Sequence, residues 1–84
     1  MNRSLKLNSF LKRARMKAGI TQGEAATKLG FTSPQYISNC ERSLCPVSEN
    51  LFKKLADLYS VPVEKLIKLR LKDYEADLRK LVGL

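Results

Sequence analysis

The sequence has no histidine and no tryptophan, and only two cysteines among its 84 residues. Without histidine it lacks the commonest general base and the commonest ligand of transition metals, and the usual Ser/His and Cys/His catalytic pairs cannot form. Cys40 and Cys45 alone supply neither the four ligands of a structural zinc site nor the disulfide framework of a secreted mini-protein. We therefore expect a chain that is not an enzyme, needs no metal or cofactor and works in a reducing cytoplasm.

Long apolar runs are also missing. The basic stretch 1–17 has no continuous hydrophobic segment of the kind that a signal peptide requires, and no later run is long enough to cross a membrane. A chain of this length buries only about 60% of the surface that its unfolded form exposes, which leaves little room for a deep substrate pocket. These absences favour a small cytoplasmic domain without membrane contact.

Acidic residues are few, since eight Asp and Glu stand against sixteen Lys and Arg, for a formal net charge of +8. Residues 1–54 hold ten basic and three acidic side chains, whereas residues 55–84 hold six and five. The positive charge of the first two-thirds indicates a polyanionic partner. A solvated basic surface with no specific partner is the alternative that charge alone leaves open.

Apolar residues recur at helical spacing along nearly the whole chain and no alternating strand pattern is present, which predicts an all-α fold. Thr21 and Glu24 have the spacing of a capping box, and Gly19 ends the preceding helix. Ser33 is expected to cap a third helix with Pro34 as its first residue. Five helices are expected, over about 8–18, 21–30, 34–42, 48–59 and 63–82, with Ser48 capping the fourth.

The second and third predicted helices are joined by a short turn containing Gly30, the spacing of a helix-turn-helix. The chain here resembles the phage-repressor and Cro-like helix-turn-helix family, also called the XRE family of bacterial transcription regulators. The resemblance covers roughly residues 7–70 and rests on several separated motifs: Leu11-Lys-Arg-Ala-Arg15, Gly19-Ile20-Thr21-Gln22, Ala26, Leu29-Gly30, Tyr36-Ile37-Ser38, Glu41 and Pro46. It implies a five-helix, lambda-repressor-like DNA-binding domain with the last helix extended.

The resemblance also implies which residues meet double-stranded DNA. The residues expected to read base edges in the major groove are Pro34, Gln35, Ser38 and Asn39, and those expected to contact phosphates are Gln22, Thr32, Ser33 and Arg42. The amides of Gln35 and Asn39 can donate and accept at once, which matches the N6/N7 edge of adenine. The alternative for these side chains, and above all for Ser38, is that they are ordinary solvated polar residues.

Other positions are expected to serve structure. In the family, the residues equivalent to Arg15 and Glu41 form a buried or half-buried ion pair that locks the first helix to the third. The sequence departs from the family pattern by one extra residue between Gly30 and Ile37 and by Ser43, which stands where a glycine with positive φ usually closes the third helix. Two further departures are Ala25 in place of Leu and Cys40 in place of a branched aliphatic residue. Cys40 is expected in the core and Cys45 in a loop, with a redox switch between them as the alternative.

The C-terminal segment contains a second apolar pattern. Ile67, Leu71, Tyr74, Leu78 and Leu81 are spaced 4, 3, 4 and 3 apart, which is the seam of a short coiled coil, and charged residues that include Asp73 flank it. We therefore divide the chain into a DNA-binding domain, residues 1–66, and a dimerisation extension, residues 67–84. The alternative is that this stripe folds back on its own core.

Together these features predict a sequence-specific, double-stranded-DNA-binding transcription regulator, a repressor or autoregulator that acts at the nucleoid. It would bind an inverted-repeat operator as a homodimer, with the third helix in the major groove. One alternative is an antitoxin or adaptor whose main target is a protein bound through the C-terminal helix. RNA binding is the other, although few aromatic residues are present to stack on bases.

Overall fold

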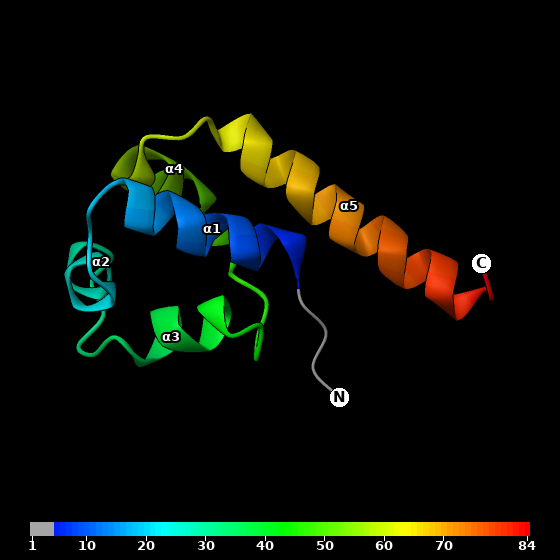
Figure 1. The fold of residues 1–84 in the computed structure, drawn as a ribbon, viewed down its shortest axis with the longest axis horizontal. Coiled ribbons are helices and arrows are strands. Elements are labelled where there is room, and N and C mark those ends of the chain that lie inside the picture. Colours follow the sequence, from blue (N-terminus) through cyan, green and yellow to red (C-terminus); the bar gives the residue numbers. More distant parts are fainter. Residues whose placement is uncertain (1–4) are drawn as a thin grey trace.

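The computed structural model describes residues 5–84, which fold into α-helices joined by short connections (Figure 1). The first four residues, which include Arg3 of the basic count, lie outside the described residues. The elements in chain order are α1 (Lys6–Lys17), α2 (Gln22–Lys28), α3 (Gln35–Glu41), the 3-10 turn η1 (Glu49–Leu51), α4 (Phe52–Tyr59) and α5 (Val63–Leu81). No strand occurs between residues 5 and 84, so the all-α prediction is confirmed.

The junction of the first two helices follows the local sequence as predicted. The Thr21 hydroxyl accepts a hydrogen bond from the Glu24 amide at 3.0 Å, and the Glu24 carboxylate accepts one from the Thr21 amide at 2.9 Å. These bonds form the predicted capping box, and the Thr21 amide lowers the pKa of Glu24 because it stabilises the ionised carboxylate. Gly19 follows α1 with a φ of +74°, a left-handed conformation that glycine adopts without steric cost.

The start of α3 differs from the prediction by one residue. Pro34 lies outside the helix as its N-cap, with φ −77° and ψ 3°, and Gln35 is the first helical residue. Ser33 does not cap this helix as expected, since its hydroxyl accepts only a long bond of 3.4 Å from the Gln35 amide. The predicted cap is therefore wrong, because the chain enters α3 through a turn at Pro34.

The prediction that Ser48 caps α4 is also wrong. The chain first forms the tighter turn η1, and α4 begins only at Phe52. The Ser48 side chain makes no capping hydrogen bond, and the Ser48 amide donates to the hydroxyl of Tyr36 at 2.8 Å. The backbone at this point is held by α3, which explains why a local cap is not needed.

One hydrophobic core lies between the helices, and Cys40 belongs to it with 5% of its surface exposed, as expected. Each helix contributes side chains at helical spacing, so that one face of each points inward. The buried apolar residues are Leu7, Leu11, Ala14, Ala25, Ala26, Leu29, Ile37, Cys40, Val47, Phe52, Leu55, Ala56, Tyr59 and Leu66. On α5 the core takes in Leu66 of the first turn, and Leu69 of the next turn packs against it while partly exposed.

A buried carboxylate ties α5 to α1. We expected Asp73 among the exposed residues that flank the apolar seam, but this prediction is wrong, because only 9% of Asp73 is exposed. The two oxygens of Asp73 accept hydrogen bonds from the amides of Lys6 and Leu7, at 3.0 and 3.2 Å. These amides are donors that a helix N-terminus leaves unpaired, and their partial positive charge favours a carboxylate. Asp73 therefore caps α1 and sets the direction in which α5 crosses it.

Beyond this anchor, α5 extends past the other helices to the C-terminus (Figure 1). It runs without a break from Val63 to Leu81, through the predicted division between residues 66 and 67. Although α5 is the longest helix among residues 5–84, neither it nor any other helix there is apolar enough over the length needed to cross a bilayer.

Candidate nucleic-acid interface

The connection between α2 and α3 is held by two aromatic rings. The ring of Phe31 lies 4.9 Å from that of Tyr36, centroid to centroid, with 30° between the planes. The Tyr36 hydroxyl accepts the hydrogen bond from Ser48 described above, and burial raises the pKa of this phenol. The ring contact and the hydrogen bond to Ser48 therefore hold the turn that contains the extra residue between Gly30 and Ile37.

A buried ion pair holds α1 against the end of α3. Arg15 Nε lies 2.5 Å from Glu41 Oε2, and Arg15 Nη2 donates to Glu41 Oε1 at 3.0 Å, with 10% and 5% of the two side chains exposed. Arg15 Nη1 also donates to the carbonyl of Ile20 at 2.7 Å. The bonds to Glu41 raise the pKa of Arg15. The planar guanidinium thus joins α1, the turn that follows it, and α3.

The first residue of α2 also contacts this ion pair. Gln22 Nε2 donates to Glu41 Oε1 at 2.9 Å, a contact that our sequence analysis did not predict. An amide nitrogen carries two hydrogens, so Gln22 keeps a second donor. Its side chain is half-buried, and its position at the start of α2 is where helix amides and the helix dipole favour an anion.

The outer face of α3 carries the residues expected to read bases. Gln35 is exposed, and Ser38 and Asn39 are half-buried. Gln35 Nε2 donates to Asn39 Oδ1 at 2.9 Å, which leaves Gln35 Oε1 to accept and Asn39 Nδ2 to donate. These two side chains border an open hollow of about 320 Å³. Pro34 is exposed at the entrance of the helix, so the structure places all four residues at or on one helix.

The residues expected to contact phosphates lie at the two ends of α3. Thr32 and Ser33 are exposed in the turn before it, and Arg42 is exposed at its C-cap. The Arg42 amide donates to the Ser38 carbonyl at 3.0 Å, but its guanidinium makes no hydrogen bond or ion pair with any residue between 5 and 84 and is free for a ligand. Gln22 lies near this end of α3, because its amide reaches Glu41.

Two polar residues brace the end of α3 in ways that our sequence analysis missed. Asn8 is only 1% exposed, and its Nδ2 donates to the carbonyls of Cys40 and Cys45 at 2.7 and 2.8 Å. Ser43 has the positive φ expected at its position, 58°, and its hydroxyl accepts a hydrogen bond from the Leu5 amide at 3.2 Å. In the sequence, Asn8 stands among the apolar positions of the inward face of α1. This position could have predicted its buried hydrogen bonds, because a buried polar side chain must find partners.

The predicted seam of α5 is exposed to solvent. Tyr74 also contacts its own chain, since its hydroxyl donates to Glu49 Oε2 at 2.9 Å and its ring lies 5.8 Å from the guanidinium of Arg70. The exposed fractions are 46% for Ile67, 59% for Leu71, 50% for Tyr74, 62% for Leu78 and 81% for Leu81. The seam therefore does not fold back on its own core.

Cys40 of α3 and Cys45 of the connection that follows it lie close together, with 3.6 Å between their sulfur atoms. Both are free thiols, and Cys45 is the more exposed of the two. Burial raises the pKa of Cys40 to about 12, so very little of its reactive thiolate is present at neutral pH.

This difference in burial predicts unequal reactivity. With iodoacetamide at neutral pH, we expect Cys45 to be alkylated at least ~10-fold faster than Cys40, measured by mass spectrometry of digested samples over time. In Cys45→Ser, Cys40 should be labelled only at the rate at which the domain opens. Equal labelling of both thiols in the folded protein would contradict their placement.

Comparison with known proteins identifies this arrangement. Residues 7–67 match the family described as a helix-turn-helix domain. The chain belongs to this family. The helix-turn-helix is the α2–turn–α3 unit, and the resemblance inferred from the sequence is confirmed at the level of this family.

One relative is the HTH-type transcriptional regulator ImmR of Bacillus subtilis (strain 168), which is 40% identical over 63 residues. These residues make up 75% of the present chain and 49% of the relative, so the chain spans about half the length of the protein that it matches. The family match ends at residue 67, so most of α5 lies beyond the helix-turn-helix domain.

Proposed function

We propose that this helix-turn-helix protein binds double-stranded DNA in a sequence-specific way and regulates transcription from the site that it occupies. The observation that carries the proposal is the outer face of α3, where Gln35 and Asn39 present a free acceptor and a free donor side by side. An α-helix fits the major groove, and amide side chains that donate and accept at once suit the edge of adenine. In this arrangement Pro34 and Ser38 complete the base-reading surface.

Phosphate contacts position the helix in the groove. Arg42 at the end of α3, the hydroxyls of Thr32 and Ser33 before it, and the second amide hydrogen of Gln22 are the proposed contacts. Their number predicts an affinity that falls steeply as salt increases, because each neutralised phosphate releases counterions. The ion pair of Arg15 and Glu41 contacts no DNA in this arrangement and holds α3 in place.

We further propose that two copies pair through the seam of α5. A symmetric dimer would place two recognition helices on successive major-groove faces, about 34 Å apart, and would require an inverted-repeat operator. Repression is the simplest mode of regulation for such a dimer, because occupying a promoter needs no surface beyond the DNA interface. Such a regulator acts at the nucleoid of the cytoplasm.

Alanine variants of the two groups of contacts test the proposal. Gln35→Ala and Asn39→Ala should each reduce the preference for operator over random DNA by about 1–3 kcal/mol, because they remove base contacts. Arg42→Ala, as the matched comparison, should weaken binding to both DNAs alike and make the salt dependence less steep. Fluorescence anisotropy with both duplexes at two salt concentrations separates these outcomes. Equal losses on both duplexes for Gln35→Ala and Asn39→Ala would remove them from base reading.

A further inference from the structure

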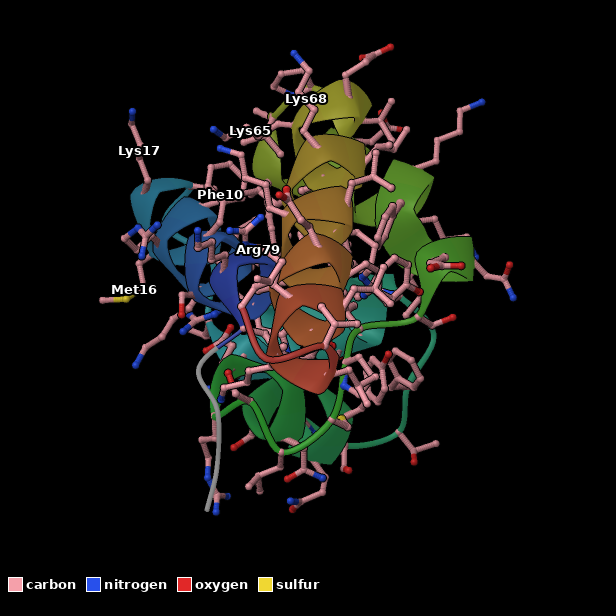
Figure 2. The ribbon with its side chains drawn as sticks, turned by 90° about the vertical axis from the view of Figure 1, so that its right-hand side faces the viewer. Phe10, Met16, Lys17, Lys65, Lys68 and Arg79 are labelled. Atoms are coloured by element: carbon pink, nitrogen blue, oxygen red, sulfur yellow. The ribbon has the colours of Figure 1, made fainter. Side chains whose placement is uncertain are left out.

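A second charged surface lies where the solvent-facing sides of α1 and α5 meet. We call it the basic face and define it by Phe10, Lys17, Lys65 and Lys68, which Figure 2 labels. Two further labelled residues lie at its margins: Met16 on another side of α1, and Arg79 on the part of α5 that extends past α1. Four of these six residues are basic and two are apolar. Lys17, Lys65 and Lys68 are exposed, as are 58% of the Arg79 side chain and 61% of Met16.

The two helices are joined within this face. Lys65 Nζ lies 5.7 Å from the centroid of the Phe10 ring, a distance at which an ammonium group is attracted to the face of an aromatic ring. Phe10 is half-buried, so part of its ring remains in contact with solvent beside the lysine. The basic face therefore combines positive charge with accessible apolar surface.

None of the three lysines of this face forms an ion pair with a residue between 5 and 84. The acidic residue nearest to them in sequence is Glu64, which is exposed and precedes Lys65 on α5. The carboxylates of Glu24, Glu41, Glu49 and Asp73 bind other partners: Thr21, Arg15, Arg70 and the start of α1. Glu75 approaches Arg79 only at 4.0 Å, and both side chains are more than half exposed. Water and salt screen a pair as exposed as this one, so Glu75 attracts Arg79 only weakly.

The basic face is separate from both surfaces of the proposed function. α1 lies between α3 and α5 (Figure 1), and in Figure 2 the labelled lysines lie at the top, far from α3 at the bottom. On α5, Leu66 and Asp73 face inward, Leu71 and Leu78 belong to the seam, and Lys65 and Lys68 lie on a third side of the helix. A copy of the chain on the seam and a duplex on α3 would leave the basic face open.

An open hollow, lined by both polar and apolar groups, borders the face at Lys17. It measures about 390 Å³ and lies between the C-terminal ends of α1 and α4, lined in part by Ile20, Leu58 and Val61. A nucleic-acid backbone offers phosphates to lysines but has no aliphatic side chains to place on Phe10 and Met16 or beside the apolar residues of the hollow. A peptide that carries both carboxylates and aliphatic side chains complements both features.

We propose that the basic face binds an acidic protein segment whose carboxylates pair with Lys17, Lys65 and Lys68. Its aliphatic side chains cover Phe10 and Met16 and enter the hollow beside Lys17. Charge steers the segment to the face, and burial of apolar surface distinguishes it from other polyanions. The proposal does not depend on DNA binding and concerns a partner that can be held while α3 is occupied.

The test uses the full chain and a fluorescently labelled helical peptide in which pairs of Glu alternate with pairs of Leu. The triple variant Lys17→Gln, Lys65→Gln, Lys68→Gln should bind this peptide at least ~10-fold more weakly than the unmodified chain. The matched control Lys28→Gln, Lys53→Gln, Lys54→Gln carries the same net charge away from the basic face and should change binding less than twofold. Fluorescence anisotropy at near-physiological salt measures both.

Three results would overturn the proposal. Equal losses in the two triple variants would mean that the peptide responds to net charge and not to the basic face. Equal binding of a peptide in which Ser replaces every Leu would mean that the apolar surface plays no part. Displacement of the peptide by a short random duplex, with duplex affinity reduced selectively in the first triple variant, would identify the basic face as a second DNA surface. A protein that bound the peptide but no operator would contradict the proposed DNA binding and not the proposed peptide site. The experiments therefore test the two proposals independently.

Discussion

Replacement of Arg15 by alanine should lower the free energy of unfolding by about 3–5 kcal/mol, because it leaves the carboxylate of Glu41 buried without its countercharge. The side chain of Glu41 is 5% exposed, and Gln22 would remain as its hydrogen-bond donor, which cannot compensate a full charge. For a domain of this size the melting temperature should fall by about 12 °C or more. Thermal unfolding followed by far-ultraviolet circular dichroism measures the change.

Two variants show whether the loss comes from the stranded charge. Arg79→Ala breaks the exposed pair with Glu75, whose side chains are 58% and 68% exposed, and should cost less than about 0.5 kcal/mol. The double variant Arg15→Met, Glu41→Leu leaves no buried charge and should recover much of the stability that Arg15→Ala loses. If Arg15→Ala cost no more than Arg79→Ala, the ion pair would not hold α1 to α3.

The variant Leu71→Glu, Leu78→Glu should weaken self-association at least about 100-fold, equivalent to about 2.7 kcal/mol. In a symmetric dimer each substitution occurs twice, and each removes a buried aliphatic side chain and places a carboxylate against an apolar partner. Both positions are exposed in the monomer, at 59% and 62%, so the fold should be unaffected. Sedimentation equilibrium measures the association constant.

The control for this variant is Lys68→Gln, Lys72→Gln, which changes the net charge equally on another side of α5. It should leave the dimer intact. If the seam variant and the unmodified chain were monomeric alike, the seam would not pair two copies. A pull-down that recovered a different chain through Tyr74, Leu78 and Leu81 would then favour the antitoxin or adaptor alternative for this surface.

Features whose causes lie within a few residues were predictable from the sequence. The capping box of Thr21 and Glu24 needs only the spacing of those two residues, and Gly19 ends α1 because its own conformation allows it. The positive φ of Ser43 followed from the resemblance, which located the end of the third helix. Such features depend on backbone geometry that no distant contact changes.

Contacts between distant helices were not predictable in the same way. Helical periodicity shows which residues share a face, but it does not show which other helix that face meets. Asp73 has the spacing of a flanking charge, yet it caps α1, because α5 happens to cross the free amides of Lys6 and Leu7. The predicted start of α4 was wrong because it also depends on a contact with another helix: the Ser48 amide donates to the hydroxyl of Tyr36 on α3.

The candidate site shows both situations. The positions of Gln35 and Asn39 on one face of α3 follow from their four-residue spacing, whereas the bond between their amides depends on side-chain rotamers that the sequence does not specify. The contact of Gln22 with Glu41 joins two helices, and it appears only once α2 is packed against α3.

The central claim is that α3 reads a DNA sequence for a symmetric dimer, and selection from a random duplex pool tests it most directly. The full chain is incubated with the pool at near-physiological salt, and the bound duplexes are recovered and sequenced. We predict enrichment of an inverted repeat with half-sites about 10 bp apart or a close multiple of that spacing. A folded protein that enriched no sequence would contradict the claim.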